Sequence, residues 1–285
     1  MRRSGTLLAA LLPTLLIAGC QSARLSGPEF VARPREVQEE ESRLRHRARD
    51  LIQALRAPHG RDAAVEELLT LPQRQSILVP LMLEALNESM MVPIDIQGSV
   101  GRQGRQACYE NEACRWRMNL LRVISGLRAE GAPFVPLLVE LARRQHDRAQ
   151  RDAGVRMNYE QALGSLGRIA WQAVEELLQR DDDVSIHIGL HAMPYLAEAL
   201  KGDEVLALRA IKLVVRHLPS DDGRGVRALD AKSCEIVRAA VALGVADADS
   251  YQRLVNACRS ELSGPPHSCR PCRSLERDVR VVSEH

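Results

Sequence analysis

The strongest constraint on the fold is a pattern of eight residues that recurs along the chain. In each copy a proline near the beginning is followed by apolar residues at helical spacing and by a glutamate four positions later. Three copies occupy residues 79–86, 135–142 and 193–200, and a fourth at 171–178 fits without the proline. Proline suits the first turn of a helix, where its missing N–H would have no partner. We therefore expect each copy to begin an amphipathic helix.

Further segments with a helical period lie beside these copies, so the helices are expected in pairs. They comprise residues 36–55, 119–127, 159–169, 205–218, 231–243 and 249–261. Aromatic residues are only 3% of the chain, and its apolar content comes mainly from Ala, Leu and Val. Such a composition favours close helix packing and is poor for a β-sandwich. The sequence therefore predicts an all-α fold.

The paired segments resemble HEAT-like repeats, including the bilin-lyase type. The resemblance is carried by the Pro-x-x-x-Glu helices and by segments such as residues 162–167 and 203–211. It covers roughly residues 62–262 and implies an α-solenoid of antiparallel helix pairs, because one pair alone cannot bury its apolar face. With the preceding helical segment, the predicted repeat domain comprises residues 36–262. The prolines are irregularly spaced, and residues 89–106 form a glycine-containing insertion. We therefore expect an irregular solenoid.

The N-terminus has the pattern of an export signal. Arg2 and Arg3 precede a short apolar stretch at residues 7–18, which is too short to span a membrane. The end of this stretch and the next two residues, Leu16-Ile17-Ala18-Gly19-Cys20, resemble the lipobox of bacterial lipoproteins. The resemblance implies removal of signal peptide 1–19 and attachment of fatty acyl chains such as palmitate to Cys20.

Residues 20–35 are expected to be a lipidated tether. They are polar or small, include two prolines and show no helical period. Several acyl chains on Cys20 would hold the protein more firmly than the marginal binding of a single chain. Gln21 stands where inner-membrane retention is associated with aspartate. The expected location is therefore the periplasmic side of the outer membrane in a two-membrane bacterium.

Six further cysteines suggest disulfides, since an even number in an exported chain favours pairing. The helices predicted at 231–243 and 249–261 would form an antiparallel hairpin that places Cys234 opposite Cys258. Cys108 and Cys114 bracket a short loop, and Cys269 and Cys272 lie in a Cys-x-x-Cys sequence. The predicted pairs are Cys234–Cys258, Cys108–Cys114 and Cys269–Cys272.

The last segment, residues 263–285, is predicted to be a charged and loosely ordered tail, because Ser-Gly-Pro-Pro at 263–266 stops the preceding helix. Two other readings of its chemistry stay open. Cys269 and Cys272 could be a redox dithiol. Together with Cys258 and His267 they could instead bind zinc. Structural disulfides are the interpretation that we prefer.

His187 and His191 are one helical turn apart, a spacing compatible with a metal site. Ile188 stands where a His-Glu-x-x-His motif has its catalytic base. A third ligand could come from Asp181, Asp182 or Asp183 if the chain folded back. Ordinary packing or surface histidines are the simpler interpretation, so we expect no metal and no cofactor.

No catalytic signature is apparent. No serine or cysteine lies in a recognisable nucleophile motif, and the glycine-containing residues 97–104 lack the Lys-Ser/Thr of a phosphate-binding loop. Bilin-lyase activity does not suit an anchored envelope protein. Removal of Arg2 and Arg3 would bring the formal charge of +2 to zero, which disfavours nucleic acid. We expect neither an enzyme nor a small-molecule substrate.

Three basic residues are candidates for binding a partner. Arg209, Lys212 and Arg216 share one helix face, and second helices line the concave side of HEAT-like stacks. They could recognise an acidic protein segment or an anionic glycan, although an ordinary solvated face is the simpler interpretation. The sequence thus predicts a lipid-anchored scaffold for an envelope protein partner. The alternatives are a metal- or thiol-dependent factor acting through the cysteine-rich C-terminus, and a structural spacer.

Overall fold

The structure is a computed structural model of the 285-residue chain, and it describes residues 35–92, 94, 107–108, 110–149, 157–218, 231–262 and 269–282. These residues are predominantly helical and include a single pair of two-residue strands. The all-α prediction is therefore confirmed. The predicted signal peptide, Cys20 and nearly all of the predicted tether lie outside the described residues.

The α-helices are α1 (Arg35–Ala54), α2 (Arg61–Thr70), α3 (Leu78–Met91), α5 (Glu112–Leu127), α6 (Val135–Ala149), α7 (Tyr159–Ser165), α8 (Trp171–Gln179), α9 (Asp183–Leu200), α10 (Glu204–Val215), α11 (Ala231–Leu243), α12 (Ala248–Leu262) and α13 (Leu275–Asp278). Short 3-10 helices are η1 (Arg128–Phe134), η2 (Gly167–Ala170) and η3 (Arg270–Ser274). The strands are β1 (Val245–Ala246) and β2 (Arg280–Val281).

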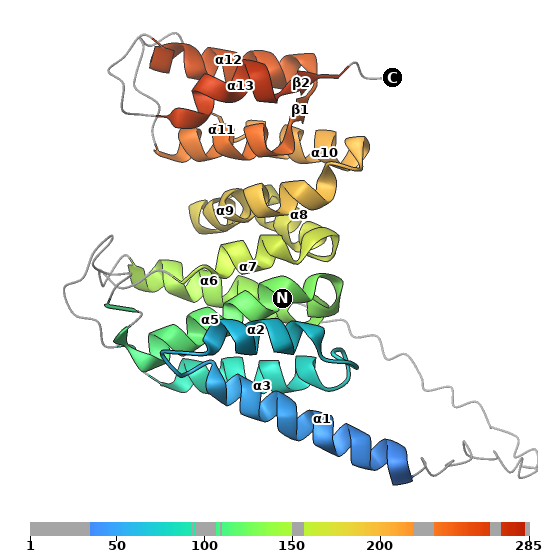
Figure 1. Cartoon of the computed structure of the whole chain (residues 1–285). Helices are drawn as coiled ribbons and strands as arrows, with labels where there is room; N and C mark the ends of the chain where they lie inside the picture. Colours follow the sequence, from blue (N-terminus) through green and yellow to red (C-terminus); the bar gives the residue numbers. More distant parts are fainter. Residues whose placement is uncertain are drawn as a thin grey trace, which may run out of the picture.

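The helices are stacked from α1 at one end to α12 at the other, with α2 and α3 both lying between α1 and α5 (Figure 1). Contacts run along two rows. In the first row α3 contacts α5, α5 contacts α7, α7 contacts α9, and α9 contacts α11. In the second row α6 contacts α8, α8 contacts α10, and α10 contacts α12. The rows are joined by contacts of α6 with α7, α8 with α9 and α10 with α11.

Local sequence explains where most of these helices begin. Pro80 and Pro136 lie in the first turns of α3 and α6, as predicted, and the copy without proline begins α8 at Trp171. The prediction for Pro194 is wrong, because this residue lies inside α9. That helix begins eleven residues earlier at Asp183, where the Asp182 carboxylate accepts a hydrogen bond from the Ser185 backbone N–H. An N-cap outweighs the helix-start preference of proline here.

A single buried apolar cluster extends along the described part of the chain. It includes Leu51 of α1, Phe134 between α5 and α6, and Val279 near the C-terminus. Because each interior helix contacts neighbours before and after it, apolar residues line more than one of its sides. Among the described residues, no helix combines the length and hydropathy that crossing a bilayer requires.

The C-terminal segment is ordered where it is described, which corrects the expectation of a loose tail. After α12, η3 and α13 pack against α11, and η3 also contacts α12. Strand β2 then pairs in parallel with β1, with Arg280 N donating to Gly244 O at 3.0 Å and Val282 N donating to Ala246 O at 2.9 Å. Gly244 has φ of +73°, a conformation that favours glycine at the end of α11.

The packing of the C-terminal segment against α11 and α12 determines two of the three disulfides. Cys108–Cys114 is confirmed. The other two predicted pairs are wrong, because Cys234 of α11 bonds Cys269 and Cys258 of α12 bonds Cys272. The prediction assumed that α11 and α12 face each other directly. Instead η3 packs against both helices, and each helix is joined to that segment.

Candidate metal centre

Helix α9 places two imidazoles on one face of the first row. His187 and His191 are separated by one turn, and their ring centroids are 4.2 Å apart. Elsewhere on the helix, Gly189 is packed so closely that an added Cβ would lie 2.8 Å from the Leu178 side chain of α8. Close packing against α8 therefore fixes α9 about its axis and with it the direction of the two histidines.

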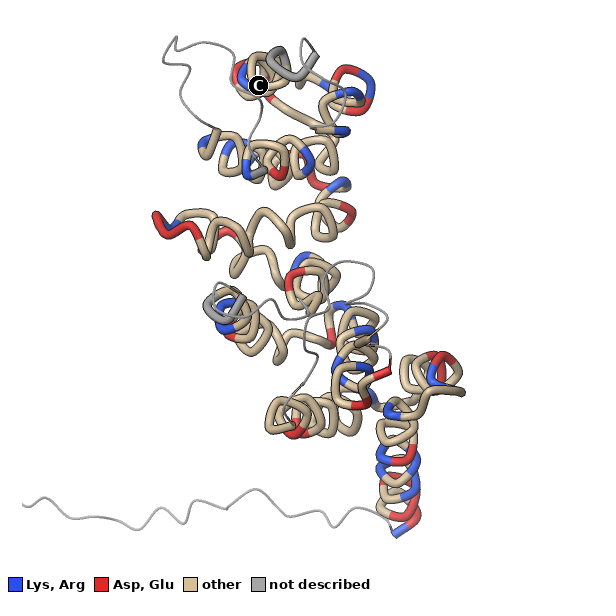
Figure 2. The backbone as a smooth tube through the Cα atoms, turned by 90° about the vertical axis from the view of Figure 1, so that its left-hand side faces the viewer, with Lys and Arg blue, Asp and Glu red and all other residues tan. Residues whose placement is uncertain are grey.

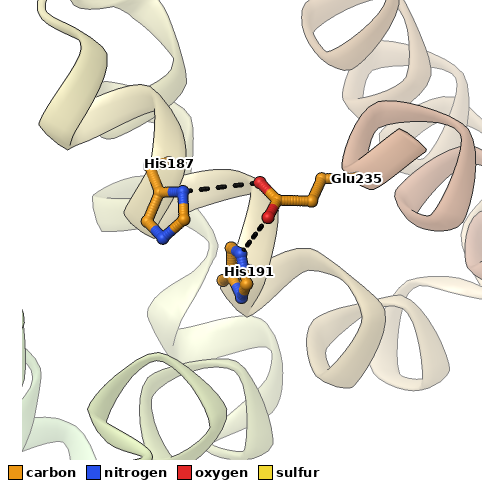
Figure 3. A group of neighbouring side chains, drawn as sticks. All are labelled: His187, His191 and Glu235. Carbon is orange, nitrogen blue, oxygen red and sulfur yellow. Dashed lines mark hydrogen bonds and ion pairs between the residues drawn. The ribbon is translucent and has the colours of Figure 1, made fainter. Parts of the chain in front are cut away.

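The third member of the cluster is Glu235, which comes from α11, the next helix of the first row. His191 Nε2 lies 2.6 Å from Glu235 Oε1, and His187 Nδ1 lies 3.4 Å from Glu235 Oε2 (Figure 3). One carboxylate therefore bridges both rings, one oxygen to each. Because Glu235 is 44 residues beyond His191, the cluster exists only through the stacking of α11 on α9.

The environment of Glu235 favours its charged form. Burial raises its pKa, but hydrogen bonds and charge from His187 and His191 have the opposite effect and outweigh it, holding the pKa at about 2. The carboxylate is thus ionised at neutral pH. The three side chains are 23%, 32% and 24% exposed for His187, His191 and Glu235, so solvent reaches all of them.

A third imidazole lies close to the cluster. His146 near the end of α6 has its ring centroid 4.9 Å from that of His187. The nearby cations are held by other groups: Arg143 donates to Ser185 Oγ at 2.7 Å, and Lys232 pairs with Asp183 at 2.7 Å. Neither of these contacts occupies the Glu235 oxygens.

The aspartates considered as a third ligand are placed differently. Asp182 caps α9 and Asp183 pairs with Lys232, so both act at the helix start. Among the described residues, the group whose potential ligand atoms converge is His187, His191 and Glu235, with these atoms within 4.8 Å of one another. Sequence spacing found the histidine pair but not the glutamate. The available signal was that Glu235 lies early in the helix predicted at 231–243, in the pair following α9.

The C-terminal cysteines are engaged elsewhere. Cys258, Cys269 and Cys272 are in disulfides, and His267 lies outside the described residues. A disulfide sulfur is neither a thiolate ligand nor a nucleophilic thiol. In this oxidised form the segment therefore acts as a structural connection.

The three basic candidates lie along α10, with Arg216 at its C-cap. Arg209 Nε is 2.5 Å from Glu175 Oε1, and Arg216 Nη2 donates to the carbonyl of Gln179 at 3.1 Å. Lys212 also interacts with a group within the molecule. Arg209 and Arg216 thus link α10 to α8, although the Arg209 side chain is still 58% exposed.

A small apolar hollow lies between α6 and α8. It is open to solvent, has a volume of about 290 Å³ and is lined by Val135, Pro136, Val139, Ala173, Glu176, Leu177 and Arg180. It is large enough for an apolar side chain and small for a cofactor.

No family model matches this chain, and comparisons with characterised proteins and with solved structures find no match either.

Proposed function

We propose that this chain is a lipid-anchored envelope protein whose helical-repeat body, an irregular α-solenoid, binds an envelope protein partner. The observation that carries the proposal is the two-row stacking of helices in chain order. Such a stack gives a long continuous surface, because each helix pair adds area beside the previous one. Because this surface is suited to recognising another protein, binding is favoured over catalysis.

Two features support placement in the envelope. The lipobox-like sequence ending at Cys20 supports lipid attachment, and Gln21 supports the outer membrane. The disulfides joining Cys108 to Cys114, Cys234 to Cys269 and Cys258 to Cys272 agree with an oxidising compartment outside the cytoplasm.

The second row offers the surface that we favour for the partner. The apolar hollow between α6 and α8 could receive an apolar side chain, and Arg209 adds an exposed cation on the neighbouring α10. Apolar anchors surrounded by charged groups are typical of protein recognition sites. The partner segment would therefore carry an apolar residue close to acidic ones.

The proposal is tested by cross-linking intact envelopes and purifying the full-length chain with its partners. The second-row variant carries Ala173→Arg, which fills the hollow, together with Arg209→Gln and Lys212→Gln. The control variant carries Arg43→Gln, Arg45→Gln and Arg49→Gln on α1. We expect one dominant envelope protein to be recovered with the native chain and the control, and to be lost with the second-row variant.

Circular dichroism of each purified variant verifies that the helices are retained. Equal recovery of the same proteins with both variants would overturn the second-row assignment. Recovery of no envelope protein with the native chain would overturn the scaffold function itself.

A further inference from the structure

We propose that His187, His191 and Glu235 form a binding site for one divalent ion of the zinc class, which would join α9 to α11. The inference goes beyond the scaffold function and does not depend on it. It begins from ligand chemistry: two imidazoles and one carboxylate are a recognised zinc ligand set that leaves one position open for water.

The geometry is close to what such an ion needs. With bonds of about 2.0–2.1 Å in tetrahedral geometry, two ligand atoms of one zinc ion are about 3.3 Å apart. The His187–Glu235 separation of 3.4 Å already has this value, and His191 at 2.6 Å would need to move by less than one ångström. The potential ligand atoms of all three residues lie within 4.8 Å of one another, and we expect side-chain rotation to bring them to the separation that zinc needs.

The charges also suit the ion. Zinc binds an ionised carboxylate and the neutral form of an imidazole, so the three ligands would together bring a charge of −1 to the ion. The nearby Lys232 is paired with Asp183. The ion would replace the hydrogen bonds that the carboxylate now receives from the two rings. Partial exposure of the three side chains provides both access for the ion and water for the fourth position.

The cluster is not needed to hold α9 against α11, because both helices already bury apolar residues. Examples are Leu190 of α9 and Ile236 of α11, which are 1% and 0% exposed, and the two helices are in contact. Two histidines converging on one carboxylate at a partly exposed edge are thus additional to the core. The assigned ligand set excludes His146, whose ring is close to His187 but lies outside the group with converging atoms.

The test uses the untagged full-length chain with its disulfides intact, so that no polyhistidine tag competes. After dialysis against a chelator, Zn²⁺ is titrated and bound metal is measured by calorimetry and by elemental analysis. We expect one zinc ion per chain. Mg²⁺ and Ca²⁺ should not compete, since they prefer sites rich in oxygen ligands. A hundredfold excess of zinc over its Kd should raise Tm by about 5–10 °C.

Matched variants identify the ligands. His187→Ala, His191→Ala and Glu235→Gln should each weaken zinc binding by about 100-fold or more, because loss of a ligand exceeds the 10–100-fold effect of losing an outer-shell group. His146→Ala next to the cluster and His46→Ala on α1 should bind as the native chain does. Glu235→Gln keeps side-chain volume, so its circular dichroism spectrum should be unchanged.

Zinc binding that survives His187→Ala and Glu235→Gln would overturn the proposal, as would a native chain that binds no zinc. Loss of binding in His146→Ala would overturn the three-residue assignment. Because partner capture is measured in a separate experiment, failure here leaves the scaffold function standing, and failure there leaves the metal site standing.

Discussion

The two ends of the helix stack are held in different ways. At the N-terminal end, α1 docks through a narrow stripe that includes Ala48, Leu51 and Ile52, while charged residues of both signs line the rest of the helix (Figure 2). At the C-terminal end, the last segment is joined to α11 and α12 by two disulfides and to β1 by backbone hydrogen bonds. One end relies on apolar burial and the other adds covalent bonds.

The two ends represent two ways of stabilising the last element of a helix stack. A terminal helix has a neighbour on only one side, so it buries less apolar surface than an interior helix. At the N-terminal end, ion pairs such as Arg47–Glu67 are exposed and add little to apolar docking. The η3–α13 segment is too short to be stable alone, and its two disulfides supply what its small apolar area does not.

The greatest loss of stability is expected from removing a disulfide at the C-terminal end. Replacement of Cys234 and Cys269 by alanine removes a bond that closes a 35-residue separation, and should cost about 3–4 kcal/mol of unfolding free energy. The same change at Cys108 and Cys114, six residues apart, should cost about 2 kcal/mol. Denaturant unfolding measures both. Equal losses would show that loop length does not govern the contribution of these disulfides.

A somewhat smaller effect is expected from truncating the apolar contact of the N-terminal end. Leu55 directly follows α1 and is fully buried, so Leu55→Ala should cost about 3 kcal/mol through lost burial and an unfilled cavity. Val37 on the same helix is 43% exposed, and Val37→Ala should change stability by less than about 0.5 kcal/mol. Similar losses from the two substitutions would contradict docking through a narrow stripe.

A smaller loss of stability is expected from removing the N-cap of α12. Asp247 accepts hydrogen bonds from Ser250 N at 2.9 Å and Ser250 Oγ at 3.0 Å, so Asp247→Ala should cost about 1 kcal/mol. Asp249→Ala, on the exposed side of the same helix, is the control. Thermal unfolding at neutral pH measures both substitutions.

The same aspartate gives a pH dependence of known sign. Burial raises the pKa of Asp247, but the hydrogen bonds from Ser250 lower it by more than burial raises it. The pKa of Asp247 in the folded protein therefore lies below the ordinary 3.8. Its contribution is therefore complete above pH 3.8 and is lost as the pH falls below that value. The stability difference between native chain and Asp247→Ala should shrink over this window. A constant difference would rule out ionisation as the cause.

The parts of this fold that depend on local sequence could be predicted. The parts that depend on contacts between segments distant in sequence could not. The bounds of α11 matched the predicted 231–243, because its apolar spacing and Gly244 act within a few residues. The pairing of Cys234 and Cys258 was predicted wrongly because η3 packs against both α11 and α12 and supplies their disulfide partners, an arrangement that the helical period does not encode. Glu235 could not be predicted for the same reason. The one-turn spacing of His187 and His191 is visible in the local sequence, but Glu235 comes from α11, which packs against α9 only in the folded protein.

The β1–β2 pairing also affects where further helix pairs could be added to this fold. Residues 270–278 pack against α11, and Arg280 and Val282 bond to the segment that joins α11 to α12, so part of the surface of the last helix pair is already covered by the returning chain. We expect that a duplicated helix pair inserted between α8 and α9 could continue both rows, whereas one added after α12 would have to displace the returning strand. Lengthening by internal duplication is thus compatible with the fold, and lengthening or self-assembly from this end is opposed.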